Sequence, residues 1–319
     1  MLFSQVRPLV AVLGPTGSGK SELSLHLAEK FSGEIVNCDS IQLYRGFDIG
    51  SAKLPPEVRR GIPHHLLDVL DPGEVTTAGD YAVRAKALLC DIAARQRLPV
   101  VVGGTGFYVR ALLDGLAEGP KRDTQLRQRL TEREGKCRGV LHRYLRRLDP
   151  VTARRIHAND LNKTIRAIEI SLLARRPAQE VFAAGRQGIE GFAPLKLVLD
   201  PPRCALHERI RTRSQSMFAN GLLDEVRRLR AEGVPDSAKP FESIGYKEAL
   251  AVLRGEMDVQ QAMELVEIHT RQYAKRQVTW FRREAGAERI QGFGWENPVL
   301  SLTDEIVSGY LDKIAKSQG

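Results

Sequence analysis

The stretch that decides the fold runs from residue 9 to residue 27. It opens with the apolar run 9–13 (LVAVL), which is typical of a buried strand. The run leads into 14–21 (GPTGSGKS), a full match to the pattern G-x-x-x-x-G-K-[ST], after which apolar residues continue as a helix. Strand, glycine-rich loop and helix in this order predict a loop whose backbone N–H groups surround the phosphates of a di- or triphosphate.

The eight residues of this loop are expected to bind the diphosphate together. The glycines let the backbone curl around one anion, and the N-terminus of the following helix adds partial positive charge. Lys20 is predicted to reach the outer phosphate, and the Ser21 hydroxyl to hold Mg²⁺, the one cofactor we expect. The predicted diphosphate ligands are Gly14, Pro15, Thr16, Gly17, Ser18, Gly19, Lys20 and Ser21.

The composition indicates a globular, cytoplasmic protein. With 319 residues, 42% of them hydrophobic, the chain has enough apolar material for a large core. It has neither an apolar run of membrane-spanning length nor an N-terminal export signal. Nothing in the sequence requires more than a monomer. The cysteines are scattered, which argues against a zinc site and a disulfide framework; they are Cys38, Cys90, Cys137 and Cys204.

The positive charge is concentrated in one segment. The chain has a formal net charge of +9. Residues 121–180 alone contain 16 Lys and Arg against 7 Asp and Glu, so this segment carries the whole surplus. A solvated helical surface would usually carry acids in balance, whereas a local basic excess is typical of a nucleic-acid-binding region.

The pattern of apolar runs predicts an α/β fold, a P-loop NTPase-like parallel sheet flanked by helices. The predicted strands are 9–13, 34–39, 98–104 and 195–200, and the predicted helices are 78–95, 204–219, 222–231 and a last long helix at 259–283. Residues 45–77 are expected to be mostly loop. The expected buried stripe of the last helix is Val259, Met263, Val266, Tyr273 and Trp280.

A charged helical segment at 121–185 interrupts this pattern. We therefore expect a core of residues 1–120 and 186–319, and a small all-helical insertion domain between its two parts. Ligands of parallel sheets bind at the carboxyl ends of the strands, which places the glycine-rich loop, Asp39 and Thr105 on one rim.

The acid at this rim is in an unusual place. Many P-loop ATPases hold magnesium with an acid at the end of a second apolar strand, but the strand 98–104 ends in two glycines and Thr105. The acid is instead Asp39, after the strand that follows the loop helix. Asp39 is either a metal ligand or a base directed at a nucleophile near the phosphates; a simple turn or cap aspartate is the structural alternative.

Several further motifs, in order along nearly the whole chain, resemble the tRNA dimethylallyltransferases. Besides the loop 14–21 they are 39–44 (DSIQLY), 48–53 (DIGSAK), 63–68 (PHHLLD), 102–108 (VGGTGFY), 166–169 (RAIE), 244–246 (IGY) and 275–282 (KRQVTWFR). The resemblance implies transfer of a dimethylallyl group from its diphosphate to N6 of adenosine 37, next to the tRNA anticodon. It also implies that the loop binds an isoprenoid diphosphate rather than ATP.

The resemblance assigns chemical roles that agree with the residue types. Asp39 would remove a proton from the adenine amine, whose lone pair is delocalised and therefore poorly nucleophilic. Lys20 and Arg213 would stabilise the leaving diphosphate, and Thr105 would hydrogen-bond near its bridging oxygen. Arg209 lies one helical turn before Arg213, so both can face one side.

The resemblance also implies a set of tRNA contacts. Ser40, Ile41 and Gln42 would hold the extruded adenine, and the inserted segment would clamp the anticodon stem-loop. The family usually has arginines where Asn162 and Lys163 stand. Trp280 and Phe281 are expected in the core rather than stacked on bases. The full predicted set is Asp39, Ser40, Ile41, Gln42, Thr105, Asp123, Asn162, Lys163, Arg166, Glu242, Ser243, Gly245, Tyr246, Lys247, Lys275, Arg276, Gln277 and Arg282.

Three other functions compete with this one. A small-molecule P-loop kinase would explain the loop and Asp39, but not the basic insertion. An isopentenyltransferase acting on free AMP would not need that insertion either. A non-catalytic RNA-binding module would leave the loop and Asp39 without a role.

Overall fold

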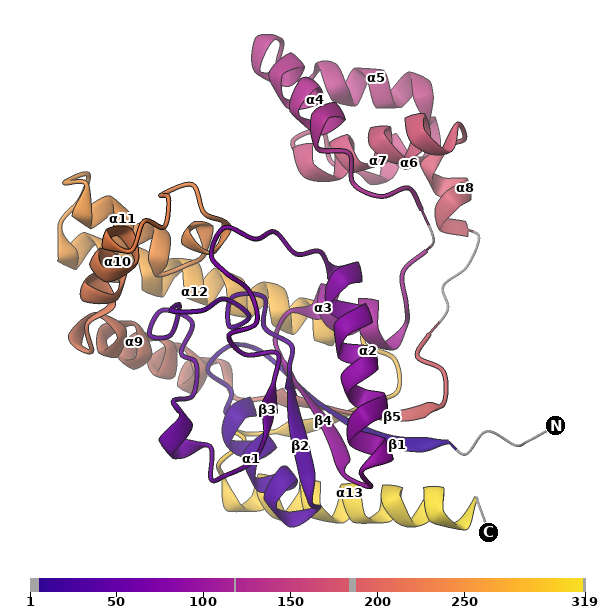
Figure 1. Cartoon of the computed structure of the whole chain (residues 1–319), viewed down its shortest axis with the longest axis vertical. Coiled ribbons are helices and arrows are strands. Elements are labelled where there is room, and N and C mark those ends of the chain that lie inside the picture. The colour runs from indigo at the N-terminus through magenta and orange to yellow at the C-terminus, as the bar shows by residue number, and fades with distance from the viewer. Residues whose placement is uncertain (1–5, 118, 184–187, 318–319) are drawn as a thin grey trace. The chain divides into compact units, whose positions relative to one another are not determined.

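The structure is a computed structural model that describes residues 6–117, 119–183 and 188–317. The chain forms two compact units (Figure 1). The larger unit comprises Met1–Leu113 and Ile189–Gly319, and the smaller unit, residues 114–188, interrupts it. Each unit has a hydrophobic core of its own.

The larger unit is built on one six-stranded sheet in which every neighbouring pair is parallel. The order is β3-β2-β4-β1-β5-β6, so the strand before the glycine-rich loop lies inside the sheet. The predicted α/β parallel-sheet fold is confirmed. The strands are β1 (Arg7–Leu13), β2 (Gly33–Asn37), β3 (His64–His65), β4 (Leu98–Gly103), β5 (Phe192–Asp200) and β6 (Ala287–Gln291).

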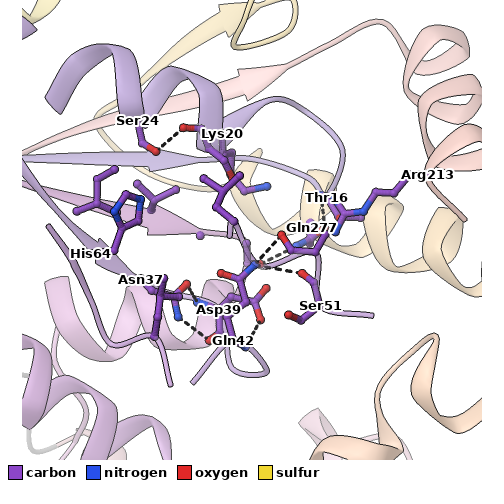
Figure 2. Close-up of a pocket in the computed structure, with 18 of the residues that line it drawn as sticks. Thr16, Lys20, Ser24, Asn37, Asp39, Gln42, Ser51, His64, Arg213 and Gln277 are labelled. Carbon is purple, nitrogen blue, oxygen red and sulfur yellow. Dashed lines mark hydrogen bonds between the residues drawn. The ribbon is translucent and has the colours of Figure 1, made fainter. Parts of the chain in front are cut away.

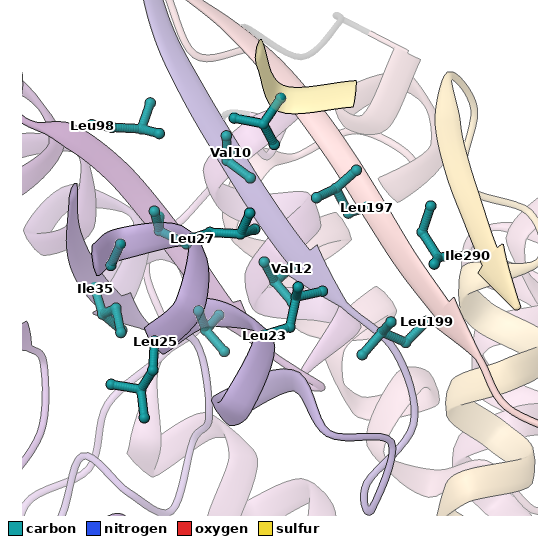
Figure 3. Packing of buried hydrophobic residues seen from close by; sticks show 14 of the residues in the cluster. Val10, Val12, Leu23, Leu25, Leu27, Ile35, Leu98, Leu197, Leu199 and Ile290 are labelled. Carbon is teal, nitrogen blue, oxygen red and sulfur yellow. The ribbon is translucent and has the colours of Figure 1, made fainter. Parts of the chain in front are cut away.

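Helices α1 (Lys20–Lys30) and α13 (Asn297–Lys316) contribute to one hydrophobic cluster with the sheet (Figure 3). In β1, Val10 and Val12 belong to this cluster, because alternate side chains of a strand point to the same face. Helix α2 (Ala78–Ala94) also packs against the sheet, at β2 and β4, but none of its residues belongs to this cluster. All residues of β2 and β4 are buried, as expected for parallel strands covered on both faces.

The remaining helices of the larger unit follow β2, β4 or β5 in the sequence. Among the described residues, no helix combines the length and apolar character that a membrane-spanning segment needs. These helices are η1 (Pro56–Val58), α3 (Gly106–Leu113), α9 (Arg203–Ala219), α10 (Leu222–Ala231), η2 (Lys239–Glu242), α11 (Tyr246–Leu253) and α12 (Val259–Phe281).

The prediction that the helix at 259–283 is the last long one is wrong. The chain continues through β6, which extends the sheet beside β5, and α13, which packs on it. The short strand has only one buried residue, Ile290, so it lacks a strong apolar signal. The segment 45–77 is mostly loop as predicted, but it contains η1 and the two-residue edge strand β3.

The predicted stripe of α12 is partly wrong. Val266 is buried, but Val259 is 39% exposed. The fully buried positions are Ala262, Val266, Ala274, Gln277 and Phe281. The observed stripe differs from the predicted one because small and polar residues of α12, not only large apolar ones, face the rest of the unit. Phe281 is in the core as expected, whereas Trp280 is only half-buried.

The smaller unit consists of five helices among its described residues, around a core that includes Leu141, Leu145, Ile165 and Ile168. Aspartates begin three of these helices, since each accepts a hydrogen bond from a backbone N–H of the first turn. The helices are α4 (Thr124–Lys136), α5 (Val140–Leu148), α6 (Pro150–Arg155), α7 (Leu161–Ala174) and α8 (Ala178–Ala183).

A buried carboxylate ties this unit together. Glu169 on α7 accepts hydrogen bonds from the Arg127 guanidinium at 2.9 Å, from Arg166 at 2.5 Å and from the Asp123 N–H at 2.8 Å. Burial opposes the charge of Glu169, but these donors outweigh it and lower the pKa of Glu169 to about 2. Arg127 and Arg166 are therefore engaged inside the unit.

Candidate active site

The glycine-rich loop joins β1 to α1 at the carboxyl end of the sheet. Gly14 and Gly19 have φ values of 144° and 87°, which side-chain-bearing residues rarely adopt. A Cβ on Gly14 would lie 2.8 Å from the Leu199 carbonyl oxygen, and one on Gly19 would lie 2.6 Å from the Gly294 nitrogen. Glycine is thus required at both positions, because β5 and the segment after β6 support the loop closely.

Lys20 lies at the first position of α1, and its Nζ donates a hydrogen bond to the Pro15 carbonyl at 2.7 Å. Burial and, to a smaller extent, the neighbouring Arg213 guanidinium lower the pKa of Lys20 to about 8, although the Asp39 and Glu22 carboxylates oppose this shift. Two cations held this close favour an anion with more than one negative charge between them.

Asp39 lies just after the end of β2, where the chain turns, and its side chain faces the site. Its Oδ1 accepts hydrogen bonds from the N–H groups of Ile41 at 2.9 Å and Gln42 at 3.4 Å. The structure gives Oδ2 no hydrogen-bond donor among the described residues. One carboxylate oxygen therefore fixes the turn, and the other is available to a ligand.

A cavity brings Lys20, Asp39 and Arg213 together (Figure 2). Lys20 comes from α1, Asp39 from the end of β2, and Arg213 from α9, so three segments distant in sequence meet at one rim of the sheet. This first cavity is also lined by Thr16, Ser21, Gln42, His64, Gly103, Gly104, Tyr273 and Gln277. The glycine-rich loop and Asp39 thus lie at one cavity, as predicted.

Two further cavities adjoin the first. The second shares Asp39, Ser51 and Arg213 with it, and is further lined by Ser40, Ile41, Glu242, Ser243, Ile244 and Arg276. The third shares Lys20, Ser21 and Arg213 with the first, and is further lined by Arg209 and Trp295. Arg213 thus lines both the space beside the loop and the space beside Ser40 and Ile41, whereas Lys20 lines the first and third cavities only.

The two arginines of α9 occupy different places. Arg213 lines all three cavities. Arg209 lies at the third cavity only, with its guanidinium 4.5 Å from the centre of the Trp295 ring. Burial lowers the pKa of Arg213, and Asp39 opposes this shift, but a guanidinium remains charged. Arg213 is the better placed of the two to contact a bound anion.

Thr105 does not line any of these cavities, unlike the two glycines before it. Its Oγ1 accepts a hydrogen bond from the Ser40 N–H at 3.3 Å. Gly103 passes so close to the Cys38 carbonyl that a Cβ would lie 2.1 Å from its oxygen. Thr105 thus connects the ends of β2 and β4 in this structure. Its predicted contact with the diphosphate oxygen stays a prediction.

Gln277 has an internal role that the sequence did not indicate. The side chain is 5% exposed. Its Oε1 accepts a hydrogen bond from the Thr16 N–H at 2.8 Å, and its Nε2 donates one to the Gly104 carbonyl at 2.9 Å. The buried amide links the glycine-rich loop to the end of β4, which does not fit the predicted contact with tRNA.

Tyr246 is also buried, with 0% exposure, so its side chain does not fit the predicted contact with tRNA either. The neighbouring Glu242, Ser243 and Lys247 are accessible or line the second cavity, as a ligand contact requires. Gly245 supports this segment with a φ of 94° at the start of α11.

The predicted residues of α12 beyond Gln277 form part of a basic surface. Lys275 and Arg276 are exposed and line a pocket together with Arg110, Trp280 and Arg283. The Arg110 guanidinium lies 4.2 Å from the centre of the Trp280 ring. Arg282 is exposed as well, and its carbonyl accepts a hydrogen bond from Arg289.

In the smaller unit the predicted contacts differ in availability. Asn162 is exposed. Lys163 is exposed and pairs with Asp160 at 2.5 Å. Arg166 is engaged by Glu169, and Asp123 is the N-cap of α4. The exposed arginines with no acidic partner among the described residues lie elsewhere in the unit, and include Arg146, Arg147, Arg154 and Arg155 of α5 and α6.

The residues of the segment 48–53 have internal contacts that the sequence did not indicate. Lys53 is buried and its Nζ donates to the Tyr44 carbonyl at 2.9 Å, to Asp48 at 2.7 Å and to Asp68 at 2.6 Å. Tyr273, which lines the first and second cavities, was expected only as part of a buried stripe. Burial raises the pKa of Tyr273 well above its usual range, so it stays a hydrogen-bond donor.

The described residues contain no group of three or more His, Cys, Asp or Glu that would hold a metal by itself. The oxygen donors at the first cavity include the Ser21 hydroxyl and the Asp39 carboxylate. Oxygen donors of this kind suit Mg²⁺, which keeps few protein ligands when phosphate oxygens supply the others. The donor set therefore fits a Mg²⁺ that arrives with a diphosphate.

Comparisons with known proteins agree with one another. The family model described as IPP transferase matches residues 42–284. A relative from Solibacter usitatus is 56% identical over 98% of this chain and 99% of its own length, and one from Koribacter versatilis is 49% identical over 94% and 97%. Both are named tRNA dimethylallyltransferase.

Two solved structures resemble the whole chain. A tRNA isopentenylpyrophosphate transferase from Bacillus halodurans matches with a TM-score of 0.73 and 34% identity, over 98% of this chain and 99% of that one. A eukaryotic dimethylallyltransferase acting on tRNA matches with a TM-score of 0.81 and 27% identity, over 95% of this chain and 80% of that one.

Proposed function

This chain belongs to the IPP transferase family, and on that basis we propose that it transfers a dimethylallyl group from dimethylallyl diphosphate to N6 of adenosine 37 of tRNA. The chain is a tRNA-prenylating enzyme; the donor and the target position are the finer parts of the proposal. The observation that supports them most is the meeting of Lys20, Arg213 and Asp39 at one cavity.

In the proposed reaction, different residues of this cavity act on the adenine and on the diphosphate. The N6 lone pair forms a bond to the allylic C1 carbon, the C1–O bond breaks, and its electron pair leaves with the diphosphate. Asp39, through its free oxygen, takes the N6 proton as the C–N bond forms. Lys20, Arg213 and the backbone N–H groups of the loop stabilise the charge on the leaving diphosphate.

Ser21 is the residue we propose to hold Mg²⁺, with phosphate oxygens as the remaining ligands. Bound there, the ion would neutralise part of the charge that develops on the leaving group. Thr105 is proposed to hydrogen-bond near the bridging oxygen of the diphosphate, and the hydrogen bond that it accepts from the Ser40 N–H holds the turn that carries Asp39.

The adenine must leave the stacked loop of the RNA to reach Asp39. The second cavity is the proposed entrance, because Ser40 and Ile41 line it next to Asp39, and Arg276 and Ser243 lie at its wall. The smaller unit, residues 114–188, is proposed to bind the anticodon stem-loop. The proposed substrate implies a cytoplasmic location, where tRNA is found, and a monomer is sufficient for all these steps.

The competing functions have less support. A kinase or an AMP-specific isopentenyltransferase would not need the basic smaller unit. The relatives named tRNA dimethylallyltransferase match 94–98% of this chain, so the match includes that unit.

The direct test is incubation with dimethylallyl diphosphate, Mg²⁺ and unmodified tRNA, followed by digestion and nucleoside mass analysis. We expect one adenosine per tRNA to gain the mass of a dimethylallyl group in place of a hydrogen, next to the anticodon. Transfer to free AMP but not to tRNA, or phosphoryl transfer from ATP to a metabolite, would contradict the proposal.

Binding of the RNA should weaken steeply with salt, because the contacts to phosphate release counterions. Changing both Arg146 and Arg147 to alanine should lower the slope of log affinity against log salt by about 1–2, roughly 0.7–0.9 for each lost phosphate contact. Both arginines are exposed on α5, so their loss should leave folding unchanged.

The matched control is Arg60→Ala, which removes an exposed arginine of the larger unit that pairs with Glu29 at 2.9 Å. It should leave the salt slope at the wild-type value. Fluorescence anisotropy of a labelled anticodon stem-loop measures both slopes. A wild-type affinity that does not change with salt would exclude the proposed RNA-binding surface.

A further inference from the structure

A short turn lines both the cavity in which the reaction is proposed to occur and the cavity proposed as the entrance for the adenine. Residues 48–52, here called the 48–52 turn, contribute Ser51 to both cavities, Gly50 to the second and Ala52 to the first. The position of this turn therefore sets the shape of the space around Asp39.

Two buried side chains from α10 and α11 hold this turn by its backbone. Glu225 Oε2 accepts hydrogen bonds from the N–H groups of Asp48 at 3.2 Å and Ile49 at 2.8 Å. Tyr246 Oη accepts one from the Gly50 N–H at 3.1 Å, and donates its own proton to Glu225 Oε1 at 2.5 Å. Three consecutive amide groups of the turn are thus bound by one connected pair.

The pair is fixed within the larger unit. Glu225 is 6% exposed, and Tyr246 is fully buried with its ring edge-on to Phe47 at a centroid distance of 4.9 Å. A Cβ on Gly50 would lie 2.5 Å from the Tyr246 ring, so the turn fits this ring only with glycine there. Burial and the Glu225 carboxylate raise the pKa of Tyr246, which keeps its proton.

The 48–52 turn, held in this position, fixes the orientation of the Gln42 side chain. Gln42 Nε2 donates hydrogen bonds to the carbonyls of Ser51 at 3.1 Å and Ala52 at 3.4 Å. An amide whose NH₂ group is bound in this way presents its oxygen, Oε1, as the end that remains for other contacts. Gln42 lines the first cavity together with Asp39, so an acceptor and a base face the same space.

We infer that Glu225 and Tyr246 are positioning residues that select the base: through the 48–52 turn and Gln42 they present an acceptor to an amino group at position 6. Adenine carries an amino group there and donates to such an acceptor. Hypoxanthine and guanine carry a carbonyl oxygen, which would face the Gln42 oxygen and bind poorly. This inference rests on the proposed function, because it concerns the base that enters the site.

The test compares two anticodon stem-loops that differ only in adenosine or inosine at the target position. Wild-type protein should bind the adenosine form at least about tenfold more tightly, as expected for one hydrogen bond gained and one repulsive contact avoided. Tyr246→Phe keeps the ring but removes the hydroxyl that joins Gly50 to Glu225. It should reduce the ratio to about twofold, with KM for dimethylallyl diphosphate changed less than about twofold.

Tyr310→Phe is the matched control. It also removes the hydroxyl of a partly buried tyrosine, one that accepts a hydrogen bond from the Leu9 N–H at 2.8 Å, far along the sheet from the turn. A similar loss of thermal stability in both variants, with the binding ratio lowered only in Tyr246→Phe, separates positioning from general destabilisation. Glu225→Gln keeps an acceptor for the turn and should retain most of the ratio, whereas Glu225→Leu should lose it.

Each result decides something different. If Tyr246→Phe keeps the wild-type ratio, or if the wild type prenylates tRNA but binds both stem-loops equally, the inference is wrong and the proposed function stands. If the wild type neither binds the adenosine stem-loop nor prenylates it, the proposed function is wrong, and the inference is overturned with it.

Discussion

Asparagine in place of Asp39 should lower kcat for prenyl transfer by about 10²- to 10⁴-fold, the usual contribution of a general base. The loss follows because asparagine cannot take the N6 proton as the C–N bond forms. Affinity for RNA should fall by much less than kcat, by about tenfold at most, because only one contact to the adenine changes and the other RNA contacts remain. Single-turnover rates with saturating dimethylallyl diphosphate, together with binding of the stem-loop, measure the two effects separately.

The choice of asparagine follows from the turn that Asp39 makes. Its Oδ1 accepts hydrogen bonds from Ile41 and Gln42, and an asparagine oxygen can accept both. Asp39→Ala loses the turn and the base together, so it serves as the comparison. If Asp39→Asn kept a near-wild-type kcat while Asp39→Ala lost activity, Asp39 would be a turn residue and not the base.

Alanine at Lys20 should lower kcat/KM for dimethylallyl diphosphate by about 10²- to 10³-fold, the usual cost of removing a preorganised donor to developing charge. Lys20 of the glycine-rich loop lines the first and third cavities together with Arg213, where the leaving diphosphate is proposed to bind. Lys30→Ala is the control, because that exposed lysine ends the same helix and pairs with Asp304. Equal kinetics for Lys20→Ala and Lys30→Ala would contradict the proposed site.

The pKa of Lys20 adds a pH dependence to this prediction. Because its pKa is lowered to about 8, the ammonium is present below that pH and is lost as the pH rises through it. The kcat/KM for the diphosphate, which reports the free enzyme, should therefore decline above about pH 8. This decline should be absent in Lys20→Ala. A profile that is flat to pH 9.5 in the wild type would show that Lys20 carries no such role.

The central part of the fold was predictable because its signals are local. The run 9–13, the glycine-rich loop and the apolar runs that became β2, β4 and β5 each carry their pattern within a few residues. Parallel pairing follows from the helices between them. The strand β6 and helix α13 were missed because their apolar residues are few and depend on the sheet for burial.

The part of the site that sequence motifs mark was predictable, and the part that depends on contacts within the protein was not. The loop and Asp39 are marked by motifs and by their place at strand ends, and the structure brings them together. The resemblance to the tRNA dimethylallyltransferases implied that Gln277 and Tyr246 are further RNA contacts, because they lie in two of the matching motifs. Only the fold shows that each is buried against a backbone group of a distant segment.

The way residues 114–188 join the larger unit makes it possible to engineer the two units separately. The backbone leaves the larger unit after Leu113 and returns at Ile189, and the Ile189 N–H donates a hydrogen bond to the Leu113 carbonyl at 3.0 Å. Exit and re-entry are thus adjacent, so a short reverse turn can reconnect them. We therefore expect that the smaller unit can be deleted, or exchanged for that of a relative, while the order of the strands in the larger unit stays the same.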